Sequence, residues 1–266
     1  MLKIARTTEA MPKQGGSPTH QNRLVVAPAD YANQSPFLLM AEDWFAPPSG
    51  FPTHPHRGME TVTFVLDGAL EHRDHTGAHG VLGAGDVQFM TAGGGVMHSE
   101  MPAPGGVHSL QLWLNLPARL KRTKARYADR KLDAARVDVR EGVTARFYAD
   151  AGSQGSVWPL TLIDVSLETG AHYDAPIPAK ARTFVYVLEG EAEVGGASLR
   201  AGQVGWADPV DTEDTLPLSS PTKARALIYA SEPINEPVVA GGPFVMNTEA
   251  EIHEAFADLR AGRLTA

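Results

Sequence analysis

The stretch "TFVLDGALE" (residues 63–71) returns in a similar form as "VYVLEGEAE" (185–193). A second stretch, "VLGAGDVQFM" (81–90), is matched in the same order by "SLRAGQVGWA" (198–207). The copies are 122 residues apart for the first pair and 117 for the second. Two matched pairs in the same order, at nearly the same separation, indicate a duplicated unit and not a chance similarity.

Short runs rich in Val, Leu, Phe and Thr surround these repeats. Examples are "HSLQLWLNLP" (108–117) and "LTLIDVSLETG" (160–170), and 26 glycines and 20 prolines are spread through the chain. This punctuation is typical of an all-β protein with many short strands. Each copy has the size of a small barrel or jelly roll, which protects strand edges by closing or doubling the sheet. A helical pattern occurs only in "NTEAEIHEAFADLRAGRL" (247–264).

We therefore predict an all-β fold of two tandem jelly-roll barrels with a short C-terminal helix. Residues 1–135 are expected to form an N-terminal metal-binding domain. Residues 136–266 are expected to form a C-terminal domain without a metal site, including the helical tail. The boundary falls in a charged region whose basic cluster, "ARLKRTKARYADRK" (118–131), we interpret as a solvated connector and not as a nucleic-acid patch.

The composition narrows the classes of function. The formal net charge of −8 does not favour nonspecific binding to nucleic acids or anionic membranes. The absence of cysteine excludes disulfides, zinc-thiolate sites and thiol nucleophiles. The first residues lack the apolar core of a signal peptide, and no window approaches the roughly 20 apolar residues of a membrane helix. We expect a cytoplasmic protein that binds neither DNA directly nor a membrane.

Two pairs of polar side chains in the first copy have the spacing of metal ligands. His54 and His56 are two residues apart in "FPTHPHRGMETV", and His98 and Glu100 are two apart in "TAGGGVMHSEMP". In an extended segment, residues i and i+2 point to the same face. Neighbouring antiparallel strands would bring the pairs together as three imidazoles and one carboxylate. Fe(II), Mn(II), Ni(II), Cu(II), Co(II) and Zn(II) accept such a mixture, whereas calcium and magnesium require more oxygen ligands.

The remaining histidines have weaker patterns. The second copy offers only His172 with Asp174, which we expect to be ordinary polar residues. The segment "EHRDHTGAHG" contains three histidines, but it lies between two strands, and we interpret it as a solvated hairpin loop. His108, at the start of a strand, is expected to be hydrogen-bonded, whereas His20 and His253 have no obvious partner.

With these residues assembled, the chain resembles the cupins, and specifically the pirin family. The first cupin motif is present as His54, His56, Glu60 and Gly68, whereas "GDVQFMTAGGGVMH" matches the second motif only loosely, without its proline. The closest resemblance to pirins is carried by four stretches, "FPTHPHRGMETVTFVLDG", "GDVQFMTAGGGVMHSEMP", "LQLWLNLP" and "GGPFVMNTEAEIHEAF". It covers the first half densely and the second half more sparsely. It implies a bicupin in which only the N-terminal barrel binds iron.

The resemblance also separates two candidate glutamates. Many cupins use the glutamate at the position of Glu60 as a ligand, whereas the pirin pattern implies His54, His56, His98 and Glu100. Glu60 would then lie behind a ligand and orient its ring, or line the pocket. The implied cofactor is one divalent transition metal, Fe(II) first, with Mn, Ni, Cu, Co or Zn also compatible.

The activity implied by the resemblance is that of a quercetin 2,3-dioxygenase, which cleaves a flavonol with O2 and releases carbon monoxide. Glu100 would act as the general base. The partners would be a small aromatic substrate and O2. Phe51, Met59, Met97 and Trp113 are candidates for an apolar cleft, with ordinary core packing as the alternative, and Arg57 for the pocket rim or the surface. The alternative function is an iron-dependent redox-sensing regulator that binds a protein partner, a transcription factor or a metabolic enzyme.

Overall fold

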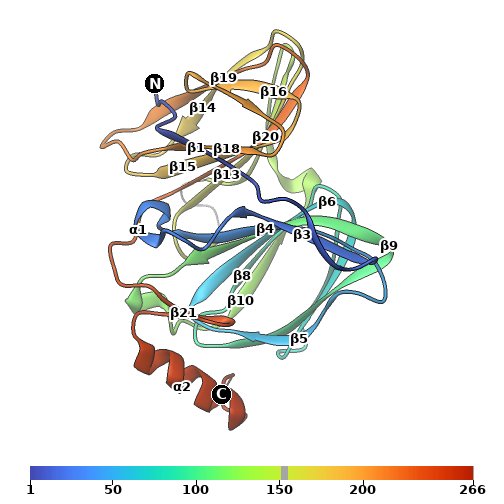
Figure 1. The fold of residues 1–266 in the computed structure, drawn as a ribbon, viewed down its shortest axis with the longest axis vertical. Helices are drawn as coiled ribbons and strands as arrows, with labels where there is room; N and C mark the ends of the chain where they lie inside the picture. Colours follow the sequence, from blue (N-terminus) through green and yellow to red (C-terminus); the bar gives the residue numbers. More distant parts are fainter. Residues whose placement is uncertain (151–154, 266) are drawn as a thin grey trace. The chain divides into compact units, whose positions relative to one another are not determined.

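The structure, a computed structural model, describes residues 1–150 and 155–265, and strands dominate it (Figure 1). Contacts divide the chain into two compact units. The first, which we call the histidine unit, contains residues 12–133, 155–157 and 234–265. The second, the companion unit, contains residues 1–11, 134–150 and 158–233. The chain passes from one unit to the other at residues 133 and 134, beside the expected boundary, while 1–11 and 234–265 each join the unit built mainly from the other half.

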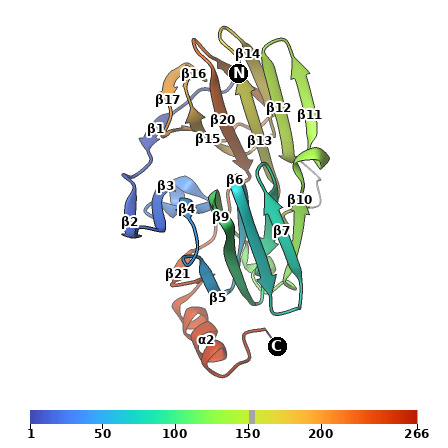
Figure 2. The same cartoon turned by 90° about the vertical axis from the view of Figure 1, so that its right-hand side faces the viewer.

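The histidine unit is organised around one large antiparallel sheet. Its strand order is β10-β8-β6-β9-β4-β3-β2, with β5 paired to β9 and β7 paired to β6. Figure 2 shows the long strands β6 and β9 side by side, with the short strand β7 next to β6. Its elements are β2 (Gln14–Ser17), β3 (His20–Val26), α1 (Tyr31–Gln34), β4 (Phe37–Phe45), β5 (Phe51–His56), β6 (Met59–Asp74), β7 (His79–Gly83), β8 (Val87–Thr91), β9 (Val96–Asn115), the 3-10 helix η1 (Ala118–Leu120), β10 (Arg126–Arg130), β21 (Val239–Gly241), β22 (Phe244–Met246) and α2 (Glu249–Arg260).

Gly68 bends β6 and does not end it. The sequence predicts a turn there, but the strand continues to Asp74, with shifts in register on both sides of Gly68. The residue has a φ of 75°, and a Cβ placed on it would lie 2.2 Å from the carbonyl oxygen of Gly106. Glycine is needed at this position because it accepts a positive φ and lets the two backbones approach. As a consequence, His72 belongs to a strand.

The companion unit consists of two sheets around an apolar core. The seven-stranded sheet has the order β1-β18-β15-β20-β13-β12-β11, and the four-stranded sheet has the order β14-β19-β16-β17. The core between them includes Ile163, Val185, Leu216 and Ile228. Its strands are β1 (Arg6–Glu9), β11 (Arg136–Arg140), β12 (Val143–Ala149), β13 (Leu160–Leu167), β14 (His172–Ile177), β15 (Arg182–Glu189), β16 (Glu191–Val194), β17 (Ala197–Arg200), β18 (Gln203–Ala207), β19 (Asp214–Ser219) and β20 (Ala224–Ser231); the 3-10 helix η2 (Leu132–Ala134) spans the boundary between the units.

The C-terminal segment packs within the histidine unit. Thr248 caps α2 in a capping box with Glu251, which satisfies backbone donors at the helix start. The inner face of the helix packs on the β21–β22 hairpin through Ile252 and Ala255. Arg57, directly after β5, forms an ion pair of 2.9 Å with Asp258 of this helix. The tail is therefore fixed to the strand that carries the first histidine pair.

The basic stretch 118–131 is not a simple connector, because it contains regular structure, although most of its basic side chains are exposed as expected. It contains η1 and β10, and β10 pairs with β8 at the edge of the large sheet. Lys121 is buried, and its Nζ donates to the carbonyl oxygens of Gly58 and Val245 and to Oδ1 of Asn115. The all-β prediction with a short C-terminal helix is confirmed. Within the described residues, no helix has the length and apolarity needed to cross a bilayer.

Candidate metal centre

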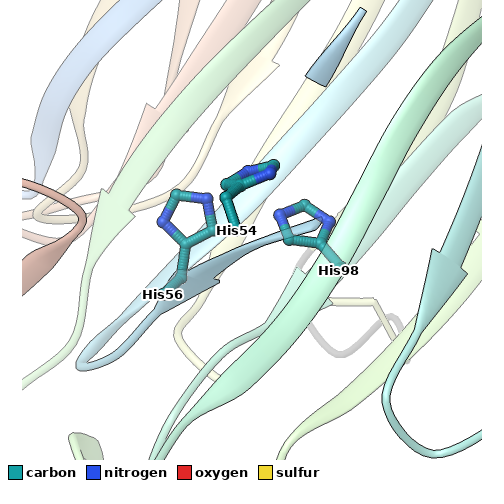
Figure 3. Close-up of side chains that lie close together, drawn as sticks. All are labelled: His54, His56 and His98. Carbon is teal, nitrogen blue, oxygen red and sulfur yellow. The ribbon is translucent and has the colours of Figure 1, made fainter. Parts of the chain in front are cut away.

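Two paired strands bring three histidines together. β5 and β9 are antiparallel, and their register places His54 opposite His98. His56 lies two residues after His54, on the same face of β5. Figure 3 shows the three rings gathered at one point, two from β5 and one from β9. The ring centroids are 4.3 Å apart for His54 and His98, 4.9 Å for His54 and His56, and 5.1 Å for His56 and His98.

In each of the two histidines of β5, one ring nitrogen has a hydrogen-bond partner. Nδ1 of His54 lies 2.9 Å from the carbonyl oxygen of Pro52, and Nδ1 of His56 lies 3.3 Å from that of Pro243. Carbonyl oxygens only accept hydrogen bonds, so both Nδ1 atoms carry the proton and both Nε2 atoms keep a lone pair. Nε2 of His56 and of His98 are buried without a hydrogen-bond partner in the described part of the chain. Buried lone pairs aimed at one point fit a metal ion.

The electrostatics of the site favour the same protonation state. Burial, followed by the neighbouring His54, lowers the pKa of His56 to about 3. Burial, followed by His54 and His56, also lowers the pKa of His98. Both rings are therefore neutral at pH 7, which is the state that binds a metal.

Glu100 lies near one of the three imidazoles, that of His98, and has its own partners. It is buried on β9, and Nε2 of Gln111 donates to both carboxylate oxygens at 3.0 Å. Oγ1 of Thr63 lies 3.4 Å from one of those oxygens. The ligand atoms of His54, His56 and His98 lie within 4.8 Å of one another, and a second group with the same spacing joins Glu100 to His98 and His72. Glu100 thus shares His98 with the three-histidine group, and its role as the fourth ligand remains a proposal.

Glu60 is held away from the imidazoles. It is buried on β6 and accepts hydrogen bonds from Oγ1 of Thr91 at 2.5 Å, from the backbone N–H of Val157 at 2.9 Å and from the hydroxyl of Ser156. It does not line the cavity beside the histidines. In the structure this carboxylate holds the 155–157 segment against the sheet.

A cavity of about 330 Å³ opens beside the histidines. His54, His56 and Glu100 line it together with Gln111, and Phe51 and Trp113 supply aromatic walls, as the sequence predicts for these two. The edge of the Trp113 ring meets His56, with centroids 5.1 Å apart at 84°. Asp43, Phe45, Thr63, Leu70, Ser109, Gly242 and Pro243 complete the lining. Most of the exposed lining is apolar, and the polar groups gather near the imidazoles.

Three other residues predicted for the cleft lie elsewhere. Met59 is fully buried in a core cluster with Met90 and Val96, and Met97 packs against the cluster under α2. Arg57 is neither at the rim nor on the surface, because Nε donates to the carbonyl oxygen of Gly94 at 2.6 Å and a terminal nitrogen pairs with Asp258. These three side chains fix the strands and the tail behind the site.

Sequence reasoning missed His72. It was assigned to a solvated loop, but it is completely buried on β6, with its ring centroid 5.1 Å from that of His98. His75 and His79 of the same stretch are exposed, as predicted. The buried apolar position of Leu70, two residues earlier on the same strand, is the signal that could have revealed the inward direction of His72.

Two further histidines of the unit have carboxylate partners. His108 is hydrogen-bonded as predicted, to Glu42 at 2.8 Å. His20 was expected to lack a partner, but its Nε2 lies 2.8 Å from Oδ1 of Asp43. Burial raises the pKa of Asp43, and the hydrogen bond to His20 lowers it in turn.

The companion unit has no equivalent group among its described residues, since both His/Glu groups of metal-binding spacing belong to the histidine unit. His172 is exposed and Asp174 half-buried, and the two side chains pair with each other at 3.0 Å. Their expected role as surface polar residues fits this geometry.

Comparison with known proteins agrees with the fold. The Pirin family model matches residues 6–114, and the model of the pirin C-terminal cupin domain matches residues 162–265. The chain belongs to the pirin family. The two matched regions correspond to the two copies recognised in the sequence, so the prediction of two cupin domains is confirmed. The histidine unit and the companion unit are therefore both parts of a pirin.

Individual pirins and related structures show how far the similarity extends. A pirin-like protein of Caulobacter vibrioides is 34% identical, with 98% of each chain covered. The crystal structure of a quercetin 2,3-dioxygenase from Acinetobacter baumannii has a TM-score of 0.89 and 30% identity, covering 100% of this chain and 99% of that one. The bacterial pirin YhhW of Escherichia coli, solved in complex with nickel(II), shares the fold with a TM-score of 0.69 at 22% identity, covering 86% and 100%.

Proposed function

We propose that this pirin is a metal-dependent dioxygenase that cleaves a flavonol such as quercetin with O2 and releases carbon monoxide. The observation that carries the proposal is the convergence of three partly or fully buried imidazoles, two of which line an apolar cavity. His54, His56 and His98 would hold the ion, with Glu100 as the fourth ligand. Similarity to the quercetin 2,3-dioxygenase of A. baumannii supports the choice of substrate class.

The cofactor we propose is one Fe(II), although the donor set also suits Mn, Ni, Cu, Co or Zn. When bound, the metal supplies Lewis acidity that lowers the proton affinity of a phenolic oxygen, and access to the redox chemistry of O2. Imidazole ligands bind a metal in their uncharged form, so they would add no negative charge to balance that of the ion. Glu100 would supply the balancing negative charge at the same wall of the cavity.

The side chains around the cavity have separate tasks in this proposal. Glu100 accepts the proton of the substrate hydroxyl, and Gln111 keeps the carboxylate oriented by donating to both of its oxygens. Phe51 and Trp113 hold a flat aromatic ring between them and keep water from the reacting face. Trp113 itself is fixed, because its Nε1 donates to Oε1 of Gln111 at 3.2 Å. One amide side chain therefore positions both the base and an aromatic wall.

The test is quercetin-dependent O2 uptake by protein purified without a polyhistidine tag and analysed for metal content. We expect about one metal ion per chain and O2 uptake with loss of the flavonol absorbance. Glu100→Gln should abolish most of the uptake, because the amide cannot take up the proton. His172→Ala, on the companion unit, serves as the control and should match the wild-type rate. Anaerobic binding of quercetin followed by no reaction on admission of O2 would reject the proposal and favour the regulatory alternative.

A further inference from the structure

His72 is a buried imidazole that the proposed function leaves without a task. Its side chain has no exposure to solvent, and its Nε2 has no hydrogen-bond partner within the described residues. A buried polar nitrogen without a partner destabilises the fold. Core packing alone would be served better by an apolar side chain, so the position points to a function.

The contact of His72 is with one of the three gathered rings. Its Nδ1 lies 3.5 Å from Nδ1 of His98. His54 and His56 have their Nδ1 atoms held in the same way, by the carbonyl oxygens of Pro52 and Pro243. All three rings of the candidate metal centre are therefore anchored through Nδ1. Two anchors are backbone oxygens, and the third is an imidazole.

An imidazole anchor differs from a carbonyl because it can either accept or donate. Only one proton fits between the two Nδ1 atoms. If His72 donates it, His98 carries its own proton on Nε2, and that atom cannot bind a metal. If His98 donates it, Nε2 of His98 keeps its lone pair, and His72 carries an unsatisfied N–H on its buried Nε2. The second arrangement leaves Nε2 of His98 able to bind a metal, and the unfavourable unsatisfied N–H then lies on His72.

We propose that His72 is a positioning residue of the metal centre, which accepts the Nδ1 proton of His98 and thereby directs Nε2 of His98 toward the ion. The proposal rests on the metal site of the proposed function, and it does not depend on the substrate. A neighbour that accepts from a ligating imidazole fixes its tautomer and its orientation, and such neighbours typically contribute about 10–100-fold to metal affinity.

The structure also offers a competing role. His72, His98 and Glu100 form the second group whose ligand atoms lie within 4.8 Å of one another, so His72 could instead bind an ion directly. The two roles differ in what can replace the side chain. A positioning residue needs an acceptor at the place of Nδ1, and the amide oxygen of asparagine provides one. A ligand needs the imidazole nitrogen itself, because a neutral amide oxygen binds these metals poorly.

Two variants, His72→Asn and His72→Leu, separate these roles in the full-length protein. The affinity for Ni(II) is measured by competition with a chromophoric chelator, and thermal unfolding is recorded on the metal-free samples. We expect His72→Leu to bind Ni(II) about 10–100-fold more weakly than the wild type. His72→Asn should bind nearly as tightly as the wild type. The order of stability should be the reverse, with the leucine variant melting above the asparagine variant, because leucine buries no polar atom.

A matched control uses His79, an exposed histidine on the neighbouring strand that pairs with Glu71 at 2.7 Å. His79→Leu should leave the Ni(II) affinity unchanged. The absorption spectrum of the Co(II)-loaded protein adds a readout of coordination, and it should be the same for the wild type and His72→Asn. A change of that spectrum, or an asparagine variant as weak as the leucine variant, would overturn the proposal in favour of direct binding by His72.

Two other outcomes reject separate parts of the argument. Equal Ni(II) affinity of His72→Leu and the wild type would reject the positioning role and leave the proposed function untouched. Tight Ni(II) binding with the expected order of variants, but no O2 uptake with quercetin, would support the role of His72 and reject the flavonol activity. A wild-type protein that binds no metal would overturn both.

Discussion

The two units of this pirin place the same i, i+2 pattern of polar residues on opposite faces of a strand. In the histidine unit, the pair on β5 faces inward, and His56 is buried beside His98. In the companion unit, His172 and Asp174 have the same i, i+2 spacing on β14, but they face solvent, while Tyr173 and Ala175 between and beside them fill the core. A change of one residue in phase moves a whole set of side chains to the other face of a sheet. The spacing of candidate ligands therefore becomes informative only together with the direction of the strand.

The interiors differ accordingly. The core cluster of the companion unit consists of apolar side chains, whereas the interior of the histidine unit also contains buried imidazoles and a carboxylate that lie near one another. An apolar interior stabilises a barrel at no risk of unsatisfied polar groups. A site for a metal and an aromatic ligand instead requires polar groups and open space inside the barrel. In our proposal the histidine unit carries the chemistry, whereas the companion unit has no candidate group of metal ligands among its described residues.

The largest expected effect is a loss of metal affinity when a proposed ligand of the histidine unit is replaced. His98→Ala removes the ring that links β9 to both histidines of β5, and we expect metal affinity to fall by more than about 100-fold. His172→Ala, at the pair with the same spacing in the companion unit, should leave the metal content unchanged. Elemental analysis of both variants after identical purification checks this. Equal loss in the two variants would mean that the ion is not held where the three rings converge.

A second prediction compares the two interiors. Ile228→Ala, in the companion core, should lower the free energy of unfolding by about 3 kcal/mol, because it opens a void in a packed region. Phe51→Ala should lower it by only about 1 kcal/mol, because the ring already borders an open cavity. Urea denaturation gives both values. A loss for Phe51→Ala as large as that for Ile228→Ala would show that this wall is packed like a core.

A third, smaller effect concerns the buried charges of the two units. In the companion unit, the guanidinium of Arg225 compensates buried Asp164 through two contacts of 2.9 Å. In the histidine unit, Lys121 has only neutral acceptors at hydrogen-bond distance among the described residues, and burial lowers its pKa from 10.5 to about 8. Between these two pH values the unfolded chain keeps a proton that the folded protein has released, so stability at this residue rises with pH.

The variant Lys121→Met isolates that contribution. The free energy of unfolding of the wild type, relative to that of the variant, should rise by about 2 kcal/mol between pH 7 and pH 9.5. Tyrosines and other groups that titrate in this range are common to both proteins and cancel in the difference. A difference that stays constant over the range would show that the lysine keeps its ordinary pKa and that its three acceptors compensate fully for burial.

The sequence was sufficient for the parts of the fold that depend on local patterns. The repeat around Gly68 and Gly190 indicated the duplication, and the i, i+2 pairs indicated three of the side chains that come together. These features depend on strand geometry alone. In the second copy, β15 and β16 do separate at Gly190, as the pattern predicts.

Other parts could not be predicted because they depend on contacts between distant segments. His72 was misassigned because β6 continues through the bend at Gly68, where the close approach of Gly106 takes the place of a turn. Glu60 has the spacing of a ligand, but Ser156 and Val157, almost 100 residues later, bind its carboxylate. The role of Arg57 likewise depends on a helix at the far end of the chain. No local pattern contains the identity of such partners.

The return of the C-terminal segment has a consequence for how the protein is made. His56 receives its anchor from the carbonyl oxygen of Pro243, 187 residues later in the chain. During synthesis, the ribosome produces His54, His56 and His98 long before that anchor exists. The group of histidines is therefore completed only after residue 243 has been synthesised, and loading of the proposed metal would be one of the last events in the maturation of the chain. Ions met by the nascent polypeptide would find an incomplete set of oriented ligands, and the completed protein would select its metal in the folded state.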